Sequence, residues 1–531
     1  MFLSQIFAKT SKESSSEVSS VNADLLERGG FIHKTMAGVY SYLPLGVRVL
    51  HRIENILREE MDKIGTEVFL PALAPVENWR KTGRFDTVNV LFQAIPANPF
   101  SARHNDAQYV LGSTHEEIIT PLVQHFCSSY QDFPCAAYQI QTKFRNEPRP
   151  KSGVLRGREF RMKDLYSFHT SEEDMLEYFF HKAIPAYQAF FSRIGLGEIT
   201  DIVLASGGDF SKEYSREFQT RCPTGEDHIF QIPGTDTRYN REVAPSKAKR
   251  WENASEKELP RQDVSGKGII GVDELAKYLK IEVERTTKTL LFETENGKVV
   301  AAAVRGDYDV NEAKLRAVLG CKALALAPAA VVKEVTGAEV GYAGPIGLPE
   351  NVRVVWDEST AGRRNFECGA NKTGEHSVNV NFGRDIPEPK EFYDIKGKEK
   401  PVYMGCYGIG TTRVLGVLAE VFHDEHGVLW PENVAPARVH IIPLAKKESD
   451  APYKEALSLY KKLQKQGVDC LFEDRINRSV GSRMADADLI GVPTRVVVSE
   501  KTLADKGLEV KDRRTGEIQM LSVAAFLKRF A

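Results

Sequence analysis

Residues 143–163 read KFRNEPRPKSGVLRGREFRMK, and this stretch guides the interpretation of the whole chain. It holds eight basic and two acidic residues. Both ends have the alternating pattern of a strand, and the middle is rich in proline, serine and glycine, which is typical of a loop. We expect two strands joined by a loop whose guanidinium groups bind phosphate oxygens in pairs. A solvated basic hairpin without a ligand is the alternative, because basic runs are common.

Two spacings in this stretch favour a nucleotide as the ligand. Arg145 and Glu147 are two residues apart and therefore lie on the same face of a strand. Phe160 follows Arg156 by four residues. A cation for phosphate and an aromatic ring for a base can thus address opposite ends of one nucleotide.

These residues resemble motif 2 of the class II aminoacyl-tRNA synthetases, which is an FRxE strand, a loop and an R-x-x-x-F strand. Motif 1 of that family is a long helix followed by a strand with a proline. It is similar to residues 46–64, where apolar residues recur every three or four positions, and to EVFLPAL at 67–73, which contains Pro71. Motif 3 is similar to GCYGIGTTRVLG at 405–416, which contains Arg413. The HIGH and KMSKS sequences of class I synthetases do not occur.

Within class II, the sequence is most similar to the bacterial type of prolyl-tRNA synthetase. LGSTHEE at 111–117 resembles the proline-binding loop of that family, and YSYLPLG at 40–46, MKDLYSFH at 162–169 and MGCYGIG at 404–410 resemble other segments of it. The resemblance extends over almost the whole chain. It implies that proline and ATP form prolyl-adenylate and that the prolyl group then passes to tRNA(Pro). ATP bound with Mg²⁺ is the implied cofactor, no further metal is expected, and motif 1 implies a homodimer.

The resemblance also implies roles for individual residues. Arg145 would contact the α-phosphate and the proline carboxylate, and Thr114 and Glu116 would hold the prolyl imino group. His169 is expected to line the same pocket, and Arg149 to meet the acceptor end of the tRNA. The γ-phosphate contacts, the contact with the adenine amino group and the adenine stack fall on Arg156 with Arg413, on Glu147 and on Phe160.

Residues 244–385 look inserted between motif 2 and motif 3. Polar stretches at 243–268 and 384–400 are expected to be linkers, and the unit between them alternates helix-like and strand-like segments. It resembles the editing insertion of bacterial prolyl enzymes, which hydrolyses alanyl-tRNA(Pro). A second site is needed because a proline pocket excludes the smaller alanine by only ~1–3 kcal/mol. The lysine, the acidic residue and the histidine of that insertion fall on Lys288, Asp357 and His376, each of which would otherwise be an ordinary surface charge.

The length of 531 residues is too great for one hydrophobic core, and we expect an α+β multidomain protein. Residues 1–243 and 386–436 would form a class II catalytic core around an antiparallel sheet, with the α/β editing unit inserted between them. Residues 437–531 alternate strands and helices and resemble the α/β anticodon-binding domain of class II synthetases. This last segment carries 18 basic and 13 acidic residues, whereas the rest of the chain is acidic overall.

The composition argues against several other classes of protein. With 42% hydrophobic and 27% charged residues, the chain is neither disordered nor fibrous. Its seven cysteines are spread out and form no C-x-x-C pair, which favours a reducing, cytoplasmic location over a secreted scaffold or a zinc site. No apolar run of ~18 residues is present, so no membrane partner is expected.

One departure from the family pattern lies just before motif 3. Prolyl enzymes with this insertion carry a glycine-rich stretch of a few dozen residues there, and it has no counterpart between 386 and 405. Arg216 also stands where the family has a histidine. Two alternatives therefore stay open: a deacylase that has lost synthesis, and a non-catalytic tRNA-binding paralog.

Overall fold

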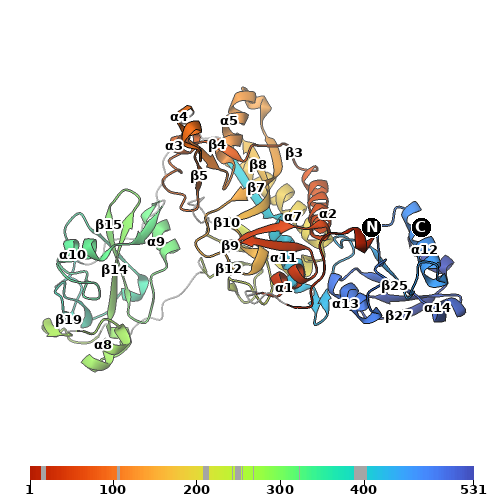
Figure 1. The fold of residues 1–531 in the computed structure, drawn as a ribbon. Coiled ribbons are helices and arrows are strands. Elements are labelled where there is room, and N and C mark those ends of the chain that lie inside the picture. The colour runs from red at the N-terminus through yellow and green to blue at the C-terminus, as the bar shows by residue number, and fades with distance from the viewer. Residues whose placement is uncertain are drawn as a thin grey trace. The chain divides into compact units, whose positions relative to one another are not determined.

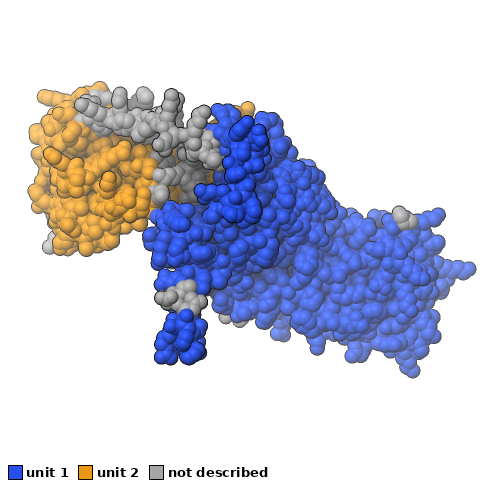
Figure 2. Space-filling view, turned by 90° about the horizontal axis from the view of Figure 1, so that it is seen from above, with its two compact units in different colours: residues 1–201, 219–226, 400–531 blue, residues 202–218, 227–399 orange. Residues whose placement is uncertain are grey.

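The computed structural model describes residues 1–13, 20–104, 108–206, 215–241, 243–244, 253, 255–266, 268–321, 323–387 and 403–530. The chain divides into two compact units. The first comprises residues 1–201, 219–226 and 400–531, and the second comprises residues 202–218 and 227–399 (Figures 1 and 2). Because the second unit interrupts the first in sequence, it has the character of an insertion.

The predicted strand, loop and strand of residues 143–163 are confirmed. β7 (Cys135–Phe144) and β8 (Glu159–His169) are antiparallel, with Phe144 opposite Glu159. β20 (Tyr403–Gly410) pairs antiparallel with the other side of β8, and the described sheet has the order β20-β8-β7-β3. The helix α11 (Thr411–Val421), which contains Arg413 of motif 3, begins directly after β20. The backbone N–H of Arg161 donates to Thr412 Oγ1 at 3.2 Å, which holds the start of α11 against β8.

The long amphipathic helix of the first unit is α2 (Pro44–Met61), where the sequence predicts a helix over 46–64. Proline is tolerated in the first turn because the N–H that it lacks would have no partner there. Gly46 lets this turn lie against another backbone, since a Cβ at this position would sit 2.1 Å from the carbonyl oxygen of Phe31. The buried apolar face of α2 consists of Leu45, Val49, Leu50, Ile53, Ile56, Leu57 and Met61.

The single strand predicted over 67–73 is wrong. The chain instead forms β3 (Thr66–Glu67), which pairs in parallel with β7, and β4 (Leu73–Pro75), which belongs to a separate sheet of order β4-β6-β5. Pro71 lies between the two strands. A proline nitrogen has no hydrogen to donate to a ladder, so the chain leaves the first sheet before it reaches this residue.

Shorter elements complete the first unit ahead of its C-terminal segment. The hairpin β1-β2 precedes α2, and α7 packs against α2. The bounds are α1 (Val21–Arg28), β1 (Ile32–Met36), β2 (Val39–Tyr42), α3 (Val76–Lys81), β5 (Phe92–Ala94), α4 (Pro99–His104), β6 (Tyr109–Leu111), α5 (Glu116–Phe126), α6 (Glu172–Tyr178), α7 (Ile184–Arg193), β21 (His423–Asp424) and β22 (Gly427–Val428).

The C-terminal segment forms an α/β layer, as the sequence predicts. Its five strands have the order β24-β23-β25-β26-β27, with β23 parallel to both of its neighbours. Phe2 pairs with Phe472 along the outer edge of β24, and their ring centres are 5.1 Å apart. Nearby, Arg48 of α2 forms an ion pair with Asp469 at 2.9 Å. The bounds are β23 (Val439–Pro443), α12 (Ala451–Lys465), β24 (Cys470–Phe472), α13 (Val480–Ile490), β25 (Thr494–Val498), α14 (Glu500–Ala504), β26 (Leu508–Asp512), β27 (Ile518–Leu521) and α15 (Val523–Leu527).

The inserted segment contains two sheets, of order β16-β14-β15-β17 and β13-β19-β18. The alternation of helix-like and strand-like segments that the sequence predicts for this unit is confirmed, for example by α8, β14 and β15. A further sheet of order β10-β9-β12-β11 is formed within residues 200–240. The bounds are β9 (Thr200–Ala205), β10 (Ser215–Thr220), β11 (Ile229–Gln231), β12 (Arg238–Asn240), β13 (Gln262–Ser265), α8 (Val272–Leu279), β14 (Thr287–Thr294), β15 (Val299–Arg305), α9 (Glu312–Leu319), β16 (Leu324–Leu326), α10 (Ala329–Thr336), β17 (Arg353–Trp356), β18 (Phe366–Gly369) and β19 (Glu375–Val380).

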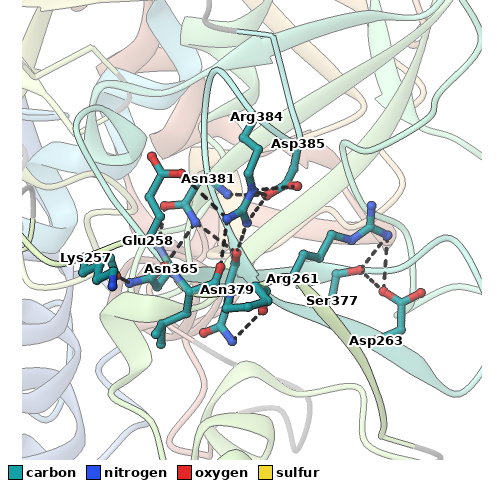
Figure 3. Close-up of polar contacts among 12 residues, drawn as sticks. Lys257, Glu258, Arg261, Asp263, Asn365, Ser377, Asn379, Asn381, Arg384 and Asp385 are labelled. Atoms are coloured by element: carbon teal, nitrogen blue, oxygen red, sulfur yellow. Dashed lines mark hydrogen bonds and ion pairs between the residues drawn. The ribbon is translucent and has the colours of Figure 1, made fainter.

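The linker predicted at 243–268 is wrong in its last part, which forms the edge strand β13 and pairs antiparallel with β19. An edge strand tolerates polar side chains because one of its sides faces no other strand. Figure 3 shows the polar contacts around this strand: Ser377 donates to Asp263 at 2.6 Å, and Arg384 donates to the carbonyl oxygen of Asn379 at 2.8 Å. The entry and exit of the inserted segment are thus held to its own sheet. Residues 388–402, and with them most of the linker predicted at 384–400, lie outside the described residues.

Candidate active site

The end of β7 and the start of α11 bring two arginines together. Arg145 follows the last residue of β7, and its backbone N–H donates to the carbonyl oxygen of Arg158 at 2.8 Å, which extends the hairpin. Its guanidinium carbon lies 5.2 Å from the centre of the Phe160 ring. Burial and the charge of Arg413, in the first turn of α11, lower the pKa of Arg145. Two cations and an aromatic face therefore meet at this corner of the sheet.

Arg156 and Glu147 form an ion pair on the other side of the loop. Nη2 and Nε of Arg156 donate to Glu147 Oε2 at 2.9 and 3.0 Å. Nη1 donates to Glu226 at 3.3 Å, a partner that the sequence does not suggest. The pairing orients Glu147, whose backbone carbonyl also accepts a hydrogen bond from Arg158 at 3.0 Å. Two of the residues expected to contact ATP are thus held in one cluster.

Thr114 and Glu116 lie side by side at the start of α5. The hydroxyl of Thr114 donates to Glu116 Oε2, and the thiol of Cys406, on β20, donates to Glu116 Oε1 at 3.1 Å. Arg84 donates to the same carboxylate at 3.2 Å. Burial alone would raise the pKa of Glu116, yet Arg84 and the two hydrogen bonds outweigh it and hold this pKa below its usual value. The loop therefore presents an ionised carboxylate whose side chain is only 14% exposed.

Two predicted site residues make contacts of a different kind. His169, at the end of β8, donates from Nδ1 to Asp174 at 2.8 Å, and its ring centre lies 5.4 Å from that of Tyr178. Its described contacts are thus with α6 and not with Thr114 or Glu116. Arg149 is exposed in the loop between β7 and β8.

A series of buried, hydrogen-bonded polar side chains lies beneath these residues and was not predicted from the sequence. Lys143, on β7, is fully buried, forms an ion pair with Asp164 of β8 and donates to Nδ1 of His115. Burial and the charge of Lys143 lower the pKa of His115 to about 4, so the ring is neutral. Its Nε2–H therefore donates to the carbonyl oxygen of Pro71, 3.1 Å away. Through this chain the proline of motif 1 is tied to the hairpin of motif 2.

The second unit contains the residues predicted for editing, and two of them lie at the same level of one sheet. Lys288 on β14 is opposite Val304 of β15, and Asp357 directly follows Trp356, which is opposite Ala303 on the other side of β15. Lys288 Nζ donates to Asp309 at 2.6 Å. The carboxylate of Asp357 accepts from the backbone N–H of Ser359 at 2.8 Å and so caps a short turn.

His376 lies on the second sheet of this unit and is buried. It donates from Nδ1 to Glu367 Oε1 at 2.8 Å, and Glu367 Oε2 accepts from the backbone N–H of Thr287 at 3.4 Å. This chain connects His376 to the residue that precedes Lys288. Gly266 covers the ring, since a Cβ there would sit 2.5 Å from His376 Cδ2. Glu367, which the sequence does not single out, thus links His376 to the backbone beside Lys288.

In the described part of the chain, no group of three or more histidine, cysteine, aspartate or glutamate side chains is arranged to hold a metal ion. Nor is any helix there both long and apolar enough to cross a membrane.

Comparison with known proteins identifies two domains and full-length relatives. Residues 267–386 match an aminoacyl-tRNA editing domain, and residues 438–531 match an anticodon binding domain. A proline--tRNA ligase from Bacillus cytotoxicus is 38% identical over 560 residues, which covers 97% of this chain and 96% of that protein. The chain belongs to the proline--tRNA ligase family.

Other proline--tRNA ligases agree with this assignment. The one from Geobacter sp. (strain M21) is 37% identical over 571 residues and the one from Desulforamulus reducens is 38% identical over 569 residues. These alignments cover 99% and 98% of this chain and 97% and 98% of the relatives. The chain is therefore a ligase with an editing domain, and the non-catalytic paralog is not favoured.

The proline--tRNA ligase alignments are longer than the chain itself. They extend over 560 to 571 positions, whereas this chain has 531 residues, so its relatives carry residues that have no counterpart here. The place of the shortfall before motif 3 stays a prediction, because residues 388–402 lie outside the described part.

Proposed function

We propose that this ligase activates proline with ATP and passes the prolyl group to tRNA(Pro). The observation that carries the proposal is the corner formed by Arg145, Phe160 and Arg413 beside the ionised carboxylate of Glu116. Its cations suit polyphosphate, its ring suits a base, and its carboxylate suits a cationic amino group. Mg²⁺, held by the phosphate oxygens of ATP, would neutralise charge on the departing pyrophosphate.

The reaction needs position and charge more than a covalent intermediate. The carboxylate oxygen of proline attacks the α-phosphorus of ATP, and the bond from that phosphorus to the bridging oxygen of pyrophosphate breaks. Arg145 would stabilise the negative charge that develops on the α-phosphoryl oxygens, with Arg156 and Arg413 on the γ-phosphate. Thr114 and Glu116 would accept the two N–H groups of the secondary ammonium of proline. A terminal ribose hydroxyl of the tRNA then attacks the carbonyl carbon, and AMP leaves.

ATP–pyrophosphate exchange tests this proposal directly. We expect labelled pyrophosphate to enter ATP when proline is present and not with alanine at the same low concentration. Exchange that is no faster with proline than without an amino acid would contradict the proposal. Hydrolysis of alanyl-tRNA(Pro) without any exchange would support the deacylase alternative.

The proposal includes tRNA contacts by two separate segments of the chain. The anticodon binding domain carries 18 basic and 13 acidic residues between 437 and 531, a balance that favours contact with a phosphate backbone. Arg149, exposed in the loop of the hairpin, would meet the acceptor end.

Editing of alanyl-tRNA(Pro) is proposed for the second unit, with Lys288 as the cation that stabilises charge on the ester when water attacks it. We expect Lys288→Ala to slow hydrolysis of alanyl-tRNA(Pro) at least ~10-fold and to leave proline-dependent pyrophosphate exchange unchanged. The matched control is Lys298→Ala, at an exposed position of the same hairpin. Equal hydrolysis by the two variants would show that Lys288 has no part in editing.

A homodimer is also proposed, because large apolar side chains are exposed near motif 1. Phe69 and Tyr130 are 84% and 76% exposed, and Phe126 is 71% exposed. Such residues are typical of an interface. Sedimentation equilibrium should give about twice the chain mass of 59.4 kDa, and Phe69→Asp should shift it toward the monomer. Ile518→Asp, at an exposed position of β27, should not. A monomeric unsubstituted protein would contradict the homodimer.

A further inference from the structure

Arg84 lies between two adjacent carboxylates of α5. Its Nη1 donates to Glu117 Oε1 at 2.8 Å and to Glu116 Oε2 at 3.2 Å. The guanidinium carbon is 5.5 Å from the ring centre of Trp79, which is buried on α3. One guanidinium group therefore connects α3 and the start of α5, although 32 positions separate Arg84 from Glu116.

Glu117 and Trp79 fix the position of this guanidinium. The Glu117 side chain is 1% exposed, and its Oε1 also accepts a hydrogen bond from Thr82 at 3.2 Å. The carbonyl oxygen of Glu117 accepts from Asn78 at 2.9 Å, which ties the start of α5 to α3. Because Arg84 is held on these two sides, its contact with Glu116 has a defined direction.

Glu116 depends on a cation to remain ionised. Desolvation raises the pKa of a carboxyl group, because it disfavours the charged form. A protonated carboxyl retains fewer acceptor sites and repels one N–H of a secondary ammonium, because it has become a donor itself. Arg84 supplies the compensating charge for Glu116.

We infer that Arg84 is a positioning residue for proline recognition, which keeps the Glu116 carboxylate ionised and aimed at the amino group of the substrate. This inference rests on the proposed function, in which Glu116 receives the ammonium of proline. Arg84 itself would touch no substrate atom. It is absent from the sequence-based predictions because the motif of the proline loop contains Glu116 and not its counter-ion.

Three described neighbours of Glu116 are neutral between about pH 6 and 9 and therefore supply no such charge. Burial raises the pKa of Cys406 and of Tyr166 well above their usual values, so both are neutral there. The pKa of His115 is about 4, so this ring is neutral as well. Further groups that act electrostatically on or with Glu116 are Arg145, which stays a cation, Asp164, which is paired with Lys143, and Glu117, which shares Arg84.

The experiment compares Arg84→Met, Arg84→Lys and Glu116→Gln in pyrophosphate exchange from pH 6 to 9. For Arg84→Met we expect KM for proline to rise about 10-fold or more at pH 6 and to return toward the unsubstituted value at pH 9, where even a carboxyl of raised pKa ionises. KM for ATP should change less than 2-fold. Arg84→Lys should recover most of the loss, since it restores the charge. Arg80→Met, at an exposed position on α3, is the matched control.

The outcomes separate this inference from the proposed function. If Glu116→Gln leaves KM for proline unchanged, the proline site itself is misassigned. If Glu116→Gln raises KM for proline and Arg84→Met does not, or does so equally at every pH, the role of Arg84 is wrong. Should Arg84→Met fail to fold, Arg84→Lys carries the test. At pH 6, the KM for proline of the folded lysine variant must rise less than that of Glu116→Gln. A lysine variant as impaired as Glu116→Gln overturns the inference.

Discussion

Arg145→Ala should lower kcat/KM for proline-dependent pyrophosphate exchange by about 10³-fold, since a single preorganised donor to a developing oxyanion contributes ~10²–10³. Arg145 is held in place by its own backbone bond to Arg158 and lies over Phe160. Its guanidinium group would serve both reactants, which is why its loss is expected to exceed that of Arg156. Rapid-quench measurement of adenylate formation checks the value without product release.

The lysine variant and a distant arginine sharpen this result. Arg145→Lys keeps the positive charge but loses the planar fork of the guanidinium group. We therefore expect its kcat/KM to be roughly tenfold higher than that of Arg145→Ala. Arg103→Ala, at an exposed position on α4, removes an arginine far from the hairpin in sequence and should leave exchange unchanged. An alanine variant within tenfold of the unsubstituted enzyme would show that Arg145 does not stabilise the transition state.

Asp164→Asn should destabilise the first unit by ~3–5 kcal/mol, because it leaves the ammonium of Lys143 buried without its counter-ion. Lys143 is fully buried, and its other partner, His115, is neutral. Gln139 also donates to Asp164 at 3.3 Å, so asparagine would place a third donor beside the two existing ones, Gln139 and Lys143. We expect thermal unfolding, followed by intrinsic fluorescence, to begin about 10 °C lower.

A double variant distinguishes the pair from a simple loss of packing. The double variant Lys143→Met/Asp164→Asn lacks the buried cation and should be more stable than Asp164→Asn alone. The substitution of Lys143 also removes its hydrogen bond to His115. If the loss of unfolding free energy in the double variant equals the sum of the losses in the two single variants, the two side chains are not coupled. The interpretation of the buried pair would then be wrong.

Short-range patterns predicted the hairpin and its neighbours, and the reason is local. The alternation around Arg145 and the glycine-rich start of α11 depend on backbone geometry within about ten residues, which periodicity and turn chemistry describe well. Pro71 shows where this reasoning fails. The apolar run around it has the composition of one strand, but the missing donor splits the run between two sheets.

Long-range partners could not be predicted, because a sequence pattern does not specify which distant side chain meets a buried charge. Arg84 meets Glu116, and Arg156 meets Glu226, across loops of dozens of residues. The chain under the sheet shows the same limit: Gln139, Gln141 and Lys143 alternate along one strand, and all three are buried. Polar residues at every second position are also typical of a solvent-facing side, so the sequence pattern does not distinguish this internal network from a solvated face.

The pairing of Phe2 with Phe472 is expected to reduce aggregation of the C-terminal sheet during synthesis. β24 is the outermost strand of the C-terminal sheet, and the backbone N–H of Phe472 donates to the carbonyl oxygen of Met1 at 2.9 Å. A bare strand edge is a template for aggregation, and here the opening residues of the chain occupy it. A nascent C-terminal domain therefore finds its protective edge cover already synthesised, more than 400 residues before the strand that needs it.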